Sequence, residues 1–342
     1  MINLTYQSVH QQFKLNGFHL SKEDLIRVAY SFIKEGDAYE KPVGNFIYDW
    51  FDGHSYIDLR TSGSTGAPKT IRMEKQAMVN SALATGDYFG LHAGQKALLC
   101  LPMDYIAGKM MFVRALILGL DLDFIEPTSH PLLNNDTKYD FVAMVPMQVQ
   151  HSLDRLNKIK KLIIGGTALN ENLQKELVGL PIQIFETYGM TETCTHVAAK
   201  KIGTALFNAL PNVTFEQDER GCLVVQAIKI SAEKIITNDL VELISPTQFI
   251  LKGRVDNVIN SGGVKLFPEQ IEAKLAPFIT SRFYVSALPD AVLGQKLVLY
   301  IESEPYEVNS SIFEGLSKFE KPCEILFQPK FETTASGKFI RN

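Results

Sequence analysis

The stretch KKLIIGGTALNENLQKELVGLPIQIFETYGMTET, residues 160–193, predicts a strand, a helix and a second strand in succession. Leucines recur with helical spacing between 169 and 180, Asn170 fits an N-cap, and Gly179 lies near the C-terminal end. The apolar runs on either side have the length of buried strands. A helix between two such strands indicates parallel neighbours in one sheet.

The same alternation extends from about residue 74 to 187, with strand-like runs KALLCLPM, DLDFIEP and YDFVAMVP before residue 160. Ligands of such sheets bind at the carboxyl ends of the strands, where GGTALN and TYGMTET lie. From 203 to 252 short β-like pieces follow. The last part contains a helix that begins at Pro268 and has Ile271, Leu275 and Phe278 on one face. The expected fold class is therefore α/β, a large N-terminal domain with mostly parallel sheets flanked by helices, followed by a small α+β domain.

Composition narrows the functional class. A chain of 342 residues exceeds one typical core, so two domains are expected. A net charge of −4 without long charge runs indicates neither a nucleic acid nor a membrane surface as partner. The first twenty residues lack the apolar core of a signal peptide, and the apolar run MMFVRALILGL is too short for a membrane span. Four scattered cysteines without a CxxC pair argue against a zinc site and favour a reducing, cytoplasmic location.

The segment TSGSTGAPKT, residues 61–70, differs from a P-loop at one position. Pro68 stands where that motif needs glycine, and proline has no N–H to offer a phosphate. Strand-like residues precede and follow the segment, so it is expected to join strand to strand, which disfavours a kinase-like P-loop enzyme. Its hydroxyls, glycines and lysine suit a polyphosphate, whereas a flexible Gly/Ser linker would need neither the lysine nor the proline.

Four further motifs follow this segment in order: YGMTET (188–193), TND (237–239), GRVDNVINSGGVKLFPEQIE (253–272) and TTASGK (333–338). Together the five resemble the motif series of the adenylate-forming superfamily, which comprises acyl- and aryl-CoA ligases, peptide-synthetase adenylation domains and luciferases. The resemblance covers about residues 56–342. It implies that a carboxylic acid attacks ATP in the presence of Mg²⁺, that pyrophosphate leaves, and that the acyl group passes to coenzyme A. It also implies an AMP-binding domain, 1–255, which is N-terminally short for the family, and a mobile C-terminal domain, 256–342.

The resemblance assigns roles to individual positions. The ATP-binding residues would be Thr61, Ser62, Gly63, Ser64, Thr65, Gly66, Lys69, Gly165, Gly166, Tyr188, Gly189, Asp239 and Arg254. The catalytic residues would be Thr191, Glu192 and Lys338, with Glu192 also the Mg²⁺ ligand, since a hard carboxylate suits a hard cation. The hinge would be Asp256, and the coenzyme A tunnel would include Ser261, Gly262 and Gly263.

Each assigned residue has a structural alternative. Glu192 could be a charge at a helix N-terminus, Asp239 a turn former, Arg254 a solvated cation and Lys338 part of a flexible tail. Their shared order in the chain favours function for all four. The ribose motif departs from the usual T-G-D. Asn238 replaces its glycine, and we expect Asn238 to keep the left-handed turn because asparagine tolerates that conformation well.

The acid is suggested by YGMTETCTHVAA, which resembles the o-succinylbenzoate–CoA ligases of menaquinone synthesis. In LPMDYIAG, Tyr105 replaces that family's usual histidine, and His151 replaces one of its arginines. Because o-succinylbenzoate has a second carboxylate, a cation should bind it. The acyl-substrate candidates are Tyr105, Lys109, Arg114 and His151, although each charge could also be a surface or helix-end group.

Two alternatives remain open from the sequence. Amino-acid activation would use an aspartate for the substrate ammonium, and Asp104 lies in the right region. A non-catalytic ATP-binding protein would have no use for Glu192 and Lys338. The expected partners are therefore a small carboxylic acid, ATP and coenzyme A, with neither nucleic acid nor an integral membrane segment.

Overall fold

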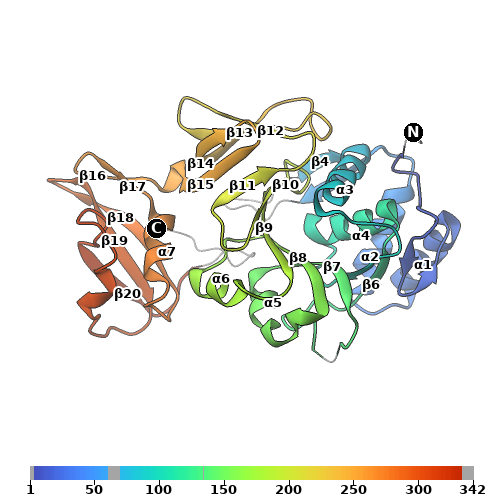
Figure 1. The fold of residues 1–342 in the computed structure, drawn as a ribbon, viewed down its shortest axis with the longest axis horizontal. Coiled ribbons are helices and arrows are strands. Elements are labelled where there is room, and N and C mark those ends of the chain that lie inside the picture. The colour runs from blue at the N-terminus through green and yellow to red at the C-terminus, as the bar shows by residue number, and fades with distance from the viewer. Residues whose placement is uncertain (1–3, 61–69, 134, 333–342) are drawn as a thin grey trace.

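The computed structural model describes residues 4–60, 70–133 and 135–332. Within these residues the chain forms a 13-stranded sheet, a separate five-stranded sheet and a two-stranded hairpin (Figure 1). The large sheet and its helices occupy residues up to Arg254, and the small sheet occupies the residues after it.

The α-helices in the described residues are α1 (Lys22–Lys34), α2 (Glu40–Phe51), α3 (Lys75–Phe89), α4 (Ile106–Leu118), α5 (Pro146–Gln150), α6 (Glu171–Leu177) and α7 (Pro268–Leu275). The large sheet contains β1 (Lys14–Leu15), β2 (Phe18–His19), β5 (Lys96–Leu99), β6 (Asp121–Phe124), β7 (Tyr139–Met144), β8 (Ile159–Ile164), β9 (Gln183–Gly189), β10 (His196–Lys201), β11 (Leu206–Ala209), β12 (Thr214–Gln217), β13 (Cys222–Gln226), β14 (Ile235–Ser245) and β15 (Gln248–Arg254). The hairpin is β3 (Tyr56–Arg60) and β4 (Thr70–Glu74). The small sheet contains β16 (Ile259–Ser261), β17 (Val264–Leu266), β18 (Phe283–Asp290), β19 (Gly294–Glu302) and β20 (Glu324–Gln328). Short 3-10 helices are η1 (Leu153–Lys158), η2 (Val255–Asn257) and η3 (Ser310–Phe313).

The strand–helix–strand unit predicted at 160–193 is confirmed as β8, α6 and β9. Strands β8 and β9 pair in parallel. The side chain of Asn170 accepts a hydrogen bond from the Leu173 amide, as an N-cap does. Leu173 and Leu177 are buried on the face of α6 that packs on the sheet. Local signals and packing agree here, which is why the sequence identified the unit correctly.

Strand β9 is where the large sheet changes direction. Strands β1, β6, β5, β7, β8 and β9 are parallel neighbours, whereas β10 pairs antiparallel with β9 and the remaining strands continue antiparallel to β12. The short β pieces expected between 203 and 252 are therefore present, and they extend the same sheet. The carboxyl end of β9 consequently lies at the junction of the parallel and antiparallel halves, a position that favours ligand binding.

The small sheet has a hydrophobic core of its own. Helix α7 begins at Pro268, as predicted, and buries Ile271 and Leu275 against this sheet. The expectation that Phe278 continues this face is wrong. The helix ends at Leu275, and Phe278 is 57% exposed in the turn beyond it.

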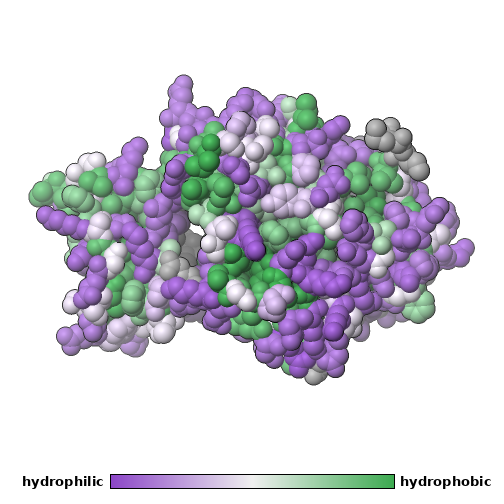
Figure 2. All heavy atoms as spheres, in the orientation of Figure 1, coloured by the Kyte–Doolittle hydropathy of each residue, from purple (hydrophilic) through white to green (hydrophobic). Residues whose placement is uncertain are grey.

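The chain passes from the large sheet to the small one through η2 alone. The division into domains 1–255 and 256–342 stays a prediction. Hydrophilic side chains cover most of the molecular face that Figure 2 shows. Hydrophobic side chains gather beside the hollow between the small sheet and the part of the chain that forms the large sheet (Figure 2). In the described ranges no helix is both long enough and apolar enough to cross a membrane.

The ends of the hairpin are held by a buried lysine. Lys75 begins α3 directly after β4, and its side chain is 0% exposed. Its ammonium donates hydrogen bonds to an Asp52 carboxylate oxygen at 2.6 Å and to the His54 carbonyl at 2.7 Å. This contact joins the end of α2 to the start of α3 and thereby anchors the hairpin. The residues between β3 and β4, 61–69, lie outside the described residues, so the predicted phosphate-binding residues Thr61, Ser62, Gly63, Ser64, Thr65, Gly66 and Lys69 have no structural description.

We predict that Asp52→Asn lowers the free energy of unfolding at neutral pH by about 1–2 kcal/mol, because it leaves the buried Lys75 ammonium without its counter-charge while solvent screens the half-exposed carboxylate. Partial burial would raise the pKa of Asp52, but hydrogen bonds from Lys75 and His54 outweigh it and lower this pKa from 3.8 to about 2. The stability that the ionised carboxylate contributes is therefore present above pH 3.8 and is lost as the pH falls through about 2.

Urea unfolding from pH 7 to pH 2 measures this difference. The matched control is Asp58→Asn, which breaks the solvent-exposed pair of Asp58 with Arg72. A loss for Asp52→Asn that equals the control, or that does not shrink with acidification, would contradict the role of this ion pair.

Candidate functional site

A tyrosine and an aspartate from distant strands meet at the carboxyl end of β9. The hydroxyl of Tyr188 donates a 2.5 Å hydrogen bond to a carboxylate oxygen of Asp239 in β14. The Tyr188 ring is 9% exposed and packs edge-on against Phe207 and Phe249. Burial, followed by the negative charge of Asp239, raises the pKa of Tyr188 far above its usual value. The tyrosine therefore remains a hydrogen-bond donor that orients the carboxylate.

Arg254 completes this group. It lies directly opposite Asp239 in the β14–β15 pairing, and its guanidinium contacts the other Asp239 oxygen at 3.2 Å. A second guanidinium nitrogen donates to Asp256 at 2.9 Å. Partial burial would lower the pKa of Arg254, but the hydrogen bond to Asp256 and the charges of both aspartates raise it. The structure thus brings Tyr188, Asp239, Arg254 and Asp256 together from three sequence motifs.

The expectation for Asn238 is wrong. Asn238 lies within β14 and is not among the non-glycine residues with positive φ in the described chain, which are Asn16, Cys194 and Asn212. The strand passes straight through the T-N-D motif, so the turn-former alternative for Asp239 fails as well. The Asn238 side chain instead accepts from Arg220 at 3.0 Å and donates to Asp256. The sequence offered no signal for this contact, because Arg220 lies in another hairpin.

The turn after β9 positions Thr191 and Glu192. A Cβ at Gly189 would lie 2.3 Å from the Thr195 carbonyl oxygen, so the chain itself requires glycine there. The buried Thr193 hydroxyl accepts from the Met190 amide at 2.9 Å and donates to the Thr195 carbonyl at 2.7 Å. Sequence analysis missed this bracing role of Thr193, although the residue stands inside the motif.

The same turn shows what surrounds Glu192. The residues between β9 and β10 form no helix, so the helix-charge alternative for Glu192 is wrong. Its carboxylate is exposed, and no basic side chain of the described chain forms an ion pair with it. Thr191 is partly exposed beside it.

The glycines after β8 lie at the same edge of the sheet. A Cβ at Gly165 would lie 2.7 Å from the Thr187 hydroxyl, which donates to the Ile164 carbonyl at 3.0 Å. Gly166 has φ +94°, a conformation that other residues rarely adopt. The carboxyl ends of β8 and β9 are thereby tied together, as expected for two neighbouring parallel strands.

Arg114 is a buried cation in the middle of α4. Its side chain is 2% exposed, and one guanidinium nitrogen donates to the Thr195 hydroxyl at 3.2 Å and to the His196 ring at 3.4 Å. Among the described residues its Nε has no hydrogen-bond partner, and no carboxylate contributes to its electrostatics. Burial lowers the pKa of Arg114 to about 10. A buried guanidinium is costly unless an anion compensates it, and no carboxylate of the described residues does so here.

His196 shapes the surroundings of Arg114. Burial, with the neighbouring Arg114 charge, lowers the pKa of His196 well below its usual value, so the ring is neutral. Its Nδ1 then accepts from Arg114, and its Nε2 donates to the Thr85 hydroxyl at 3.2 Å. A neutral His196 does not repel the guanidinium and adds no counter-charge.

The structure separates the other acyl-substrate candidates from Arg114. The Lys109 ammonium donates to the Met103 carbonyl and lies over the Phe46 ring of α2, and burial lowers its pKa. Tyr105 is 48% exposed just before α4. His151 stacks on His130 with ring centroids 4.4 Å apart on the surface after α5. Of the four candidates, Arg114 is the one that forms a hydrogen bond to the turn after β9 within the described residues.

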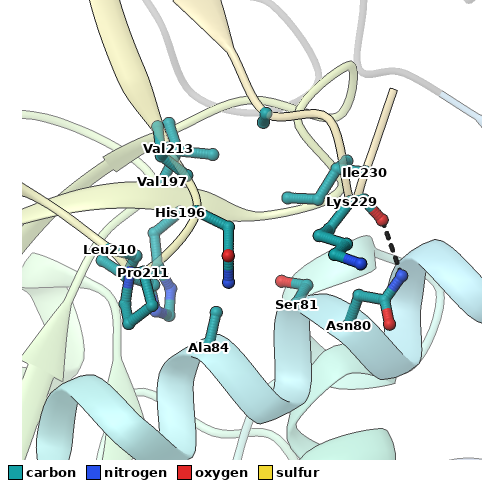
Figure 3. A pocket seen from close by; sticks show the side chains of 12 residues that line it. Asn80, Ser81, Ala84, His196, Val197, Leu210, Pro211, Val213, Lys229 and Ile230 are labelled. Atoms are coloured by element: carbon teal, nitrogen blue, oxygen red, sulfur yellow. Dashed lines mark hydrogen bonds between the residues drawn. The ribbon is translucent and has the colours of Figure 1, made fainter. Parts of the chain in front are cut away.

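A pocket opens next to His196, with about 300 Å³ of empty space that includes open solvent. Figure 3 shows Ser81 and Ala84 of α3 facing His196 across it, while Asn80 donates to the Lys229 carbonyl at 2.7 Å. Arg114 does not line this pocket. The pocket is therefore not an approach to the buried guanidinium.

The glycine-rich strip of the small sheet forms a tight hairpin. Ser261 pairs with Val264, and Gly262 and Gly263 between them have φ +57° and +82°. Two successive positive φ values are the requirement of a type I′ turn, so the hairpin by itself explains both glycines. Lys338 lies outside the described residues.

Glu192 is the side chain of this turn that could bind magnesium. No cluster of three or more His, Cys, Asp or Glu side chains with metal-binding spacing occurs in the described residues. The exposed Glu192 carboxylate, which forms no ion pair within the described residues, nevertheless fits Mg²⁺, because this ion is commonly held by one or two carboxylates together with substrate phosphates and water.

Comparison with known proteins gives consistent results. Residues 59–221 match the family described as AMP-binding enzyme. The crystal structure of an acyl-CoA synthetase (AMP-forming)/AMP-acid ligase II-like protein from Dyadobacter fermentans is similar, with 36% identity, coverage of 92% of this chain and 95% of that one, and a TM-score of 0.63.

Two more distant proteins are also similar. A 2-succinylbenzoate–CoA ligase from Lactococcus lactis is 24% identical over 86% of this chain and 71% of its own length. The o-succinylbenzoate coenzyme A synthetase (MenE) from Bacillus subtilis, solved with ATP and magnesium, is 19% identical over 94% of this chain and 81% of that chain, with a TM-score of 0.73. This last likeness concerns the fold, and the α/β fold class predicted from the sequence is confirmed.

We predict that Tyr188→Phe lowers the free energy of unfolding by about 1–2 kcal/mol, because it removes a hydrogen bond to a mostly buried carboxylate and keeps the packed ring. Urea unfolding at pH 7 measures the change. The matched control is Tyr88→Phe, which removes a longer, 3.3 Å bond from Tyr88 to the uncharged Ala199 carbonyl. Equal losses of unfolding free energy in the two variants would show that the hydrogen bond from Tyr188 to the charged Asp239 contributes no more than one to a neutral carbonyl.

Proposed function

The chain belongs to the AMP-binding enzyme family, and on that premise we propose that it activates a carboxylic acid as an acyl-adenylate and transfers the acyl group to coenzyme A. The adenylate-forming family predicted from the motifs is confirmed. ATP, Mg²⁺ and coenzyme A are the cofactor and co-substrates of such ligases. The observation that carries the proposal is the convergence of Tyr188, Asp239 and Arg254 at the carboxyl end of β9.

This group suits the nucleoside of ATP. The Asp239 carboxylate, held by Tyr188 and Arg254, has lone pairs left to accept from both ribose hydroxyls. Tyr188 is assigned to adenine by its place in the motif, and Gly189 beside it has no side chain to obstruct the base. Gly165 and Gly166 lie on the neighbouring strand end, where the backbone can approach the nucleotide.

The remaining roles concern the phosphates. Thr191 is assigned to a phosphate oxygen, Glu192 to Mg²⁺, and Thr61–Lys69 to the β- and γ-phosphates. Bound magnesium would neutralise charge on the phosphates. Lys338 is assigned to the substrate carboxylate and the α-phosphate, where two anions must meet. Ser261, Gly262 and Gly263 are assigned to the coenzyme A tunnel and Asp256 to the hinge of the moving C-terminal domain.

We further propose that the acid carries a second carboxylate and is o-succinylbenzoate. The Lactococcus lactis relative bears the name 2-succinylbenzoate–CoA ligase. The supporting observation in this chain is Arg114, a buried guanidinium without a carboxylate partner among the described residues, next to the turn that holds Thr191 and Glu192. An amino-acid substrate is less well supported, because the charge of Asp104, the candidate for its ammonium, already acts on the Lys109 ammonium, where it partly offsets the lowering of the Lys109 pKa by burial. A cytoplasmic location is part of the proposal and agrees with four free cysteines.

The function is tested by pyrophosphate release with a panel of aromatic diacids, aromatic monoacids, fatty acids and amino acids, with and without coenzyme A. We expect AMP and pyrophosphate with o-succinylbenzoate and a thioester when coenzyme A is present. ADP and orthophosphate as products would refute the reaction. Activity with amino acids alone, dependent on Asp104, would refute the substrate.

We predict that Arg114→Leu raises KM for o-succinylbenzoate at least tenfold while KM for ATP stays within about twofold, because a desolvated charged hydrogen bond is worth about 1.5–3 kcal/mol. Arg114→Lys keeps the charge but not the bidentate fork, so an intermediate KM is expected. A monoacid analogue should show little difference between the variants. If both KM values rise together with a loss of fold, Arg114 acts only in packing.

We predict that Lys338→Ala slows acyl-adenylate formation by ~10²–10³, the usual effect of removing one group that stabilises developing charge. Conversion of a supplied acyl-adenylate into the thioester should stay near the wild-type rate. The two half-reactions are measured separately, with Lys330→Ala as a surface control. Equal loss of both would contradict the assignment of Lys338 to the first step.

A further inference from the structure

One connector joins the two sheets, and a side chain from β14 holds it. The chain leaves β15 at Arg254, forms η2 from Val255 to Asn257 and enters β16. The Asp256 carboxylate in this connector accepts from Arg254 at 2.9 Å, and the Asn238 carboxamide donates to its two oxygens at 3.3 and 3.2 Å. Asn238 is therefore a link between the connector and a strand that is distant in sequence.

Arg220 holds Asn238 in turn. Its guanidinium donates to the Asn238 carboxamide oxygen at 3.0 Å and to the Thr237 carbonyl at 2.9 Å. A third nitrogen donates to Asp218 at 2.9 Å. Asp218 also accepts from the Cys222 amide at 2.8 Å. The chain of hydrogen bonds from Asp218 through Arg220 to Asn238 therefore starts in a turn with its own internal hydrogen bonds. The Arg220 guanidinium thus donates to three groups, and the Asn238 carboxamide oxygen is one of them.

This arrangement requires a carboxamide at position 238. The side chain must accept from a guanidinium on one side and donate to a carboxylate on the other, and among neutral side chains asparagine is the one of this length that does both. Aspartate would place a second negative charge against Asp256, and glycine would leave the Asp256 oxygens without this donor. The neighbouring charges also determine which way the amide is turned.

Within the connector, the Asn257 carboxamide donates to the Glu269 carboxylate of α7. Single hydrogen bonds also join α7 and the turn after it to the part of the chain that carries the large sheet. Gln270 of α7 donates to the Lys252 carbonyl at 3.0 Å, and Asn172 of α6 donates to the Ala276 carbonyl at 3.3 Å. Both are single, neutral hydrogen bonds near the surface, each worth little by itself. The charged contacts at Asp256 restrain the direction in which the chain leaves β15 more strongly than these two neutral bonds do.

We propose that Asn238 is a positioning residue for the connector: held by Arg220, it binds Asp256 and stabilises this orientation of the small sheet against others. The inference uses the proposed function in one respect only. If two half-reactions need two orientations of the small sheet, Asn238 also sets the ratio of their rates.

The orientation is tested without reference to activity. Cys323 in the small sheet's part is exposed, whereas Cys100, Cys194 and Cys222 are buried, so a spin label attaches selectively to Cys323. A second label is added through Asp87→Cys, at an exposed position of α3. We expect a narrow distance distribution in the parent protein and a broader one in Asn238→Gly and Asn238→Asp.

Two further variants separate this role from a general loosening of β14. Glu242→Gly places a glycine in the same strand and leaves Asn238 and Asp256 intact, so its distribution should stay narrow. The exchanged pair Asn238→Asp/Asp256→Asn restores one carboxamide opposite one carboxylate, so it should narrow the distribution again relative to Asn238→Asp. Unchanged distributions in Asn238→Gly and Asn238→Asp, or an exchanged pair as broad as Asn238→Asp, would overturn the proposal.

The rates provide the second readout. With the chain acting as proposed, Asn238→Gly should change the ratio of acyl-adenylate formation to thioester formation by about 2- to 10-fold, the equivalent of one hydrogen bond. Glu242→Gly should leave this ratio unchanged. If no acid supports pyrophosphate release, the proposed function fails, and the distance measurement still decides the role of Asn238.

Discussion

The pairing of Asp239 with Arg254 across β14 and β15 is the interaction on which the candidate site depends. A carboxylate at this depth needs donors, and it receives one from Arg254 and another from Tyr188. The first donor comes from the strand that leads into the connector, and the second comes from the last parallel strand of the sheet. The Asp239 carboxylate therefore connects the parallel half of the sheet to the antiparallel half. Through Arg254 it also connects both halves to the end of β15, where the chain continues towards the small sheet.

The two buried cations Lys75 and Arg114 differ in how their positive charges are compensated. Lys75 has a carboxylate at 2.6 Å and a carbonyl at 2.7 Å, so its burial stabilises the hairpin that it anchors. Arg114 is almost as buried, but its hydrogen-bond partners among the described residues are a threonine hydroxyl and a neutral imidazole. The first arrangement is complete without a ligand. The second would be completed by a ligand carboxylate, and this difference supports the proposal that Arg114 contacts the substrate.

The glycines of the motifs can be explained by the backbone structure as well as by ligand binding. At Gly189 the Thr195 carbonyl would clash with any side chain, and at Gly262 and Gly263 the hairpin demands positive φ. These requirements hold whether or not a nucleotide or coenzyme A binds. A glycine in a motif is thus weaker support for a ligand contact than the placement of a charged side chain such as Asp239, which no turn requires.

The sequence by itself determined the elements whose signals are local. The strand–helix–strand unit at 160–193, the N-cap at Asn170 and the helix start at Pro268 follow from periodicity and from the chemistry of neighbouring residues, so one sequence sufficed. The order of the motifs identified the family for the same reason. Tertiary structure alone decided the contacts between distant segments. It turned Asn238 from an expected turn residue into a bridge between Arg220 and Asp256, and it buried Arg114, one of the four proposed acyl-substrate residues, beside Thr195. Such contacts depend on the pairing of strands far apart in the chain, and no local pattern encodes which side chains that pairing brings within hydrogen-bond distance.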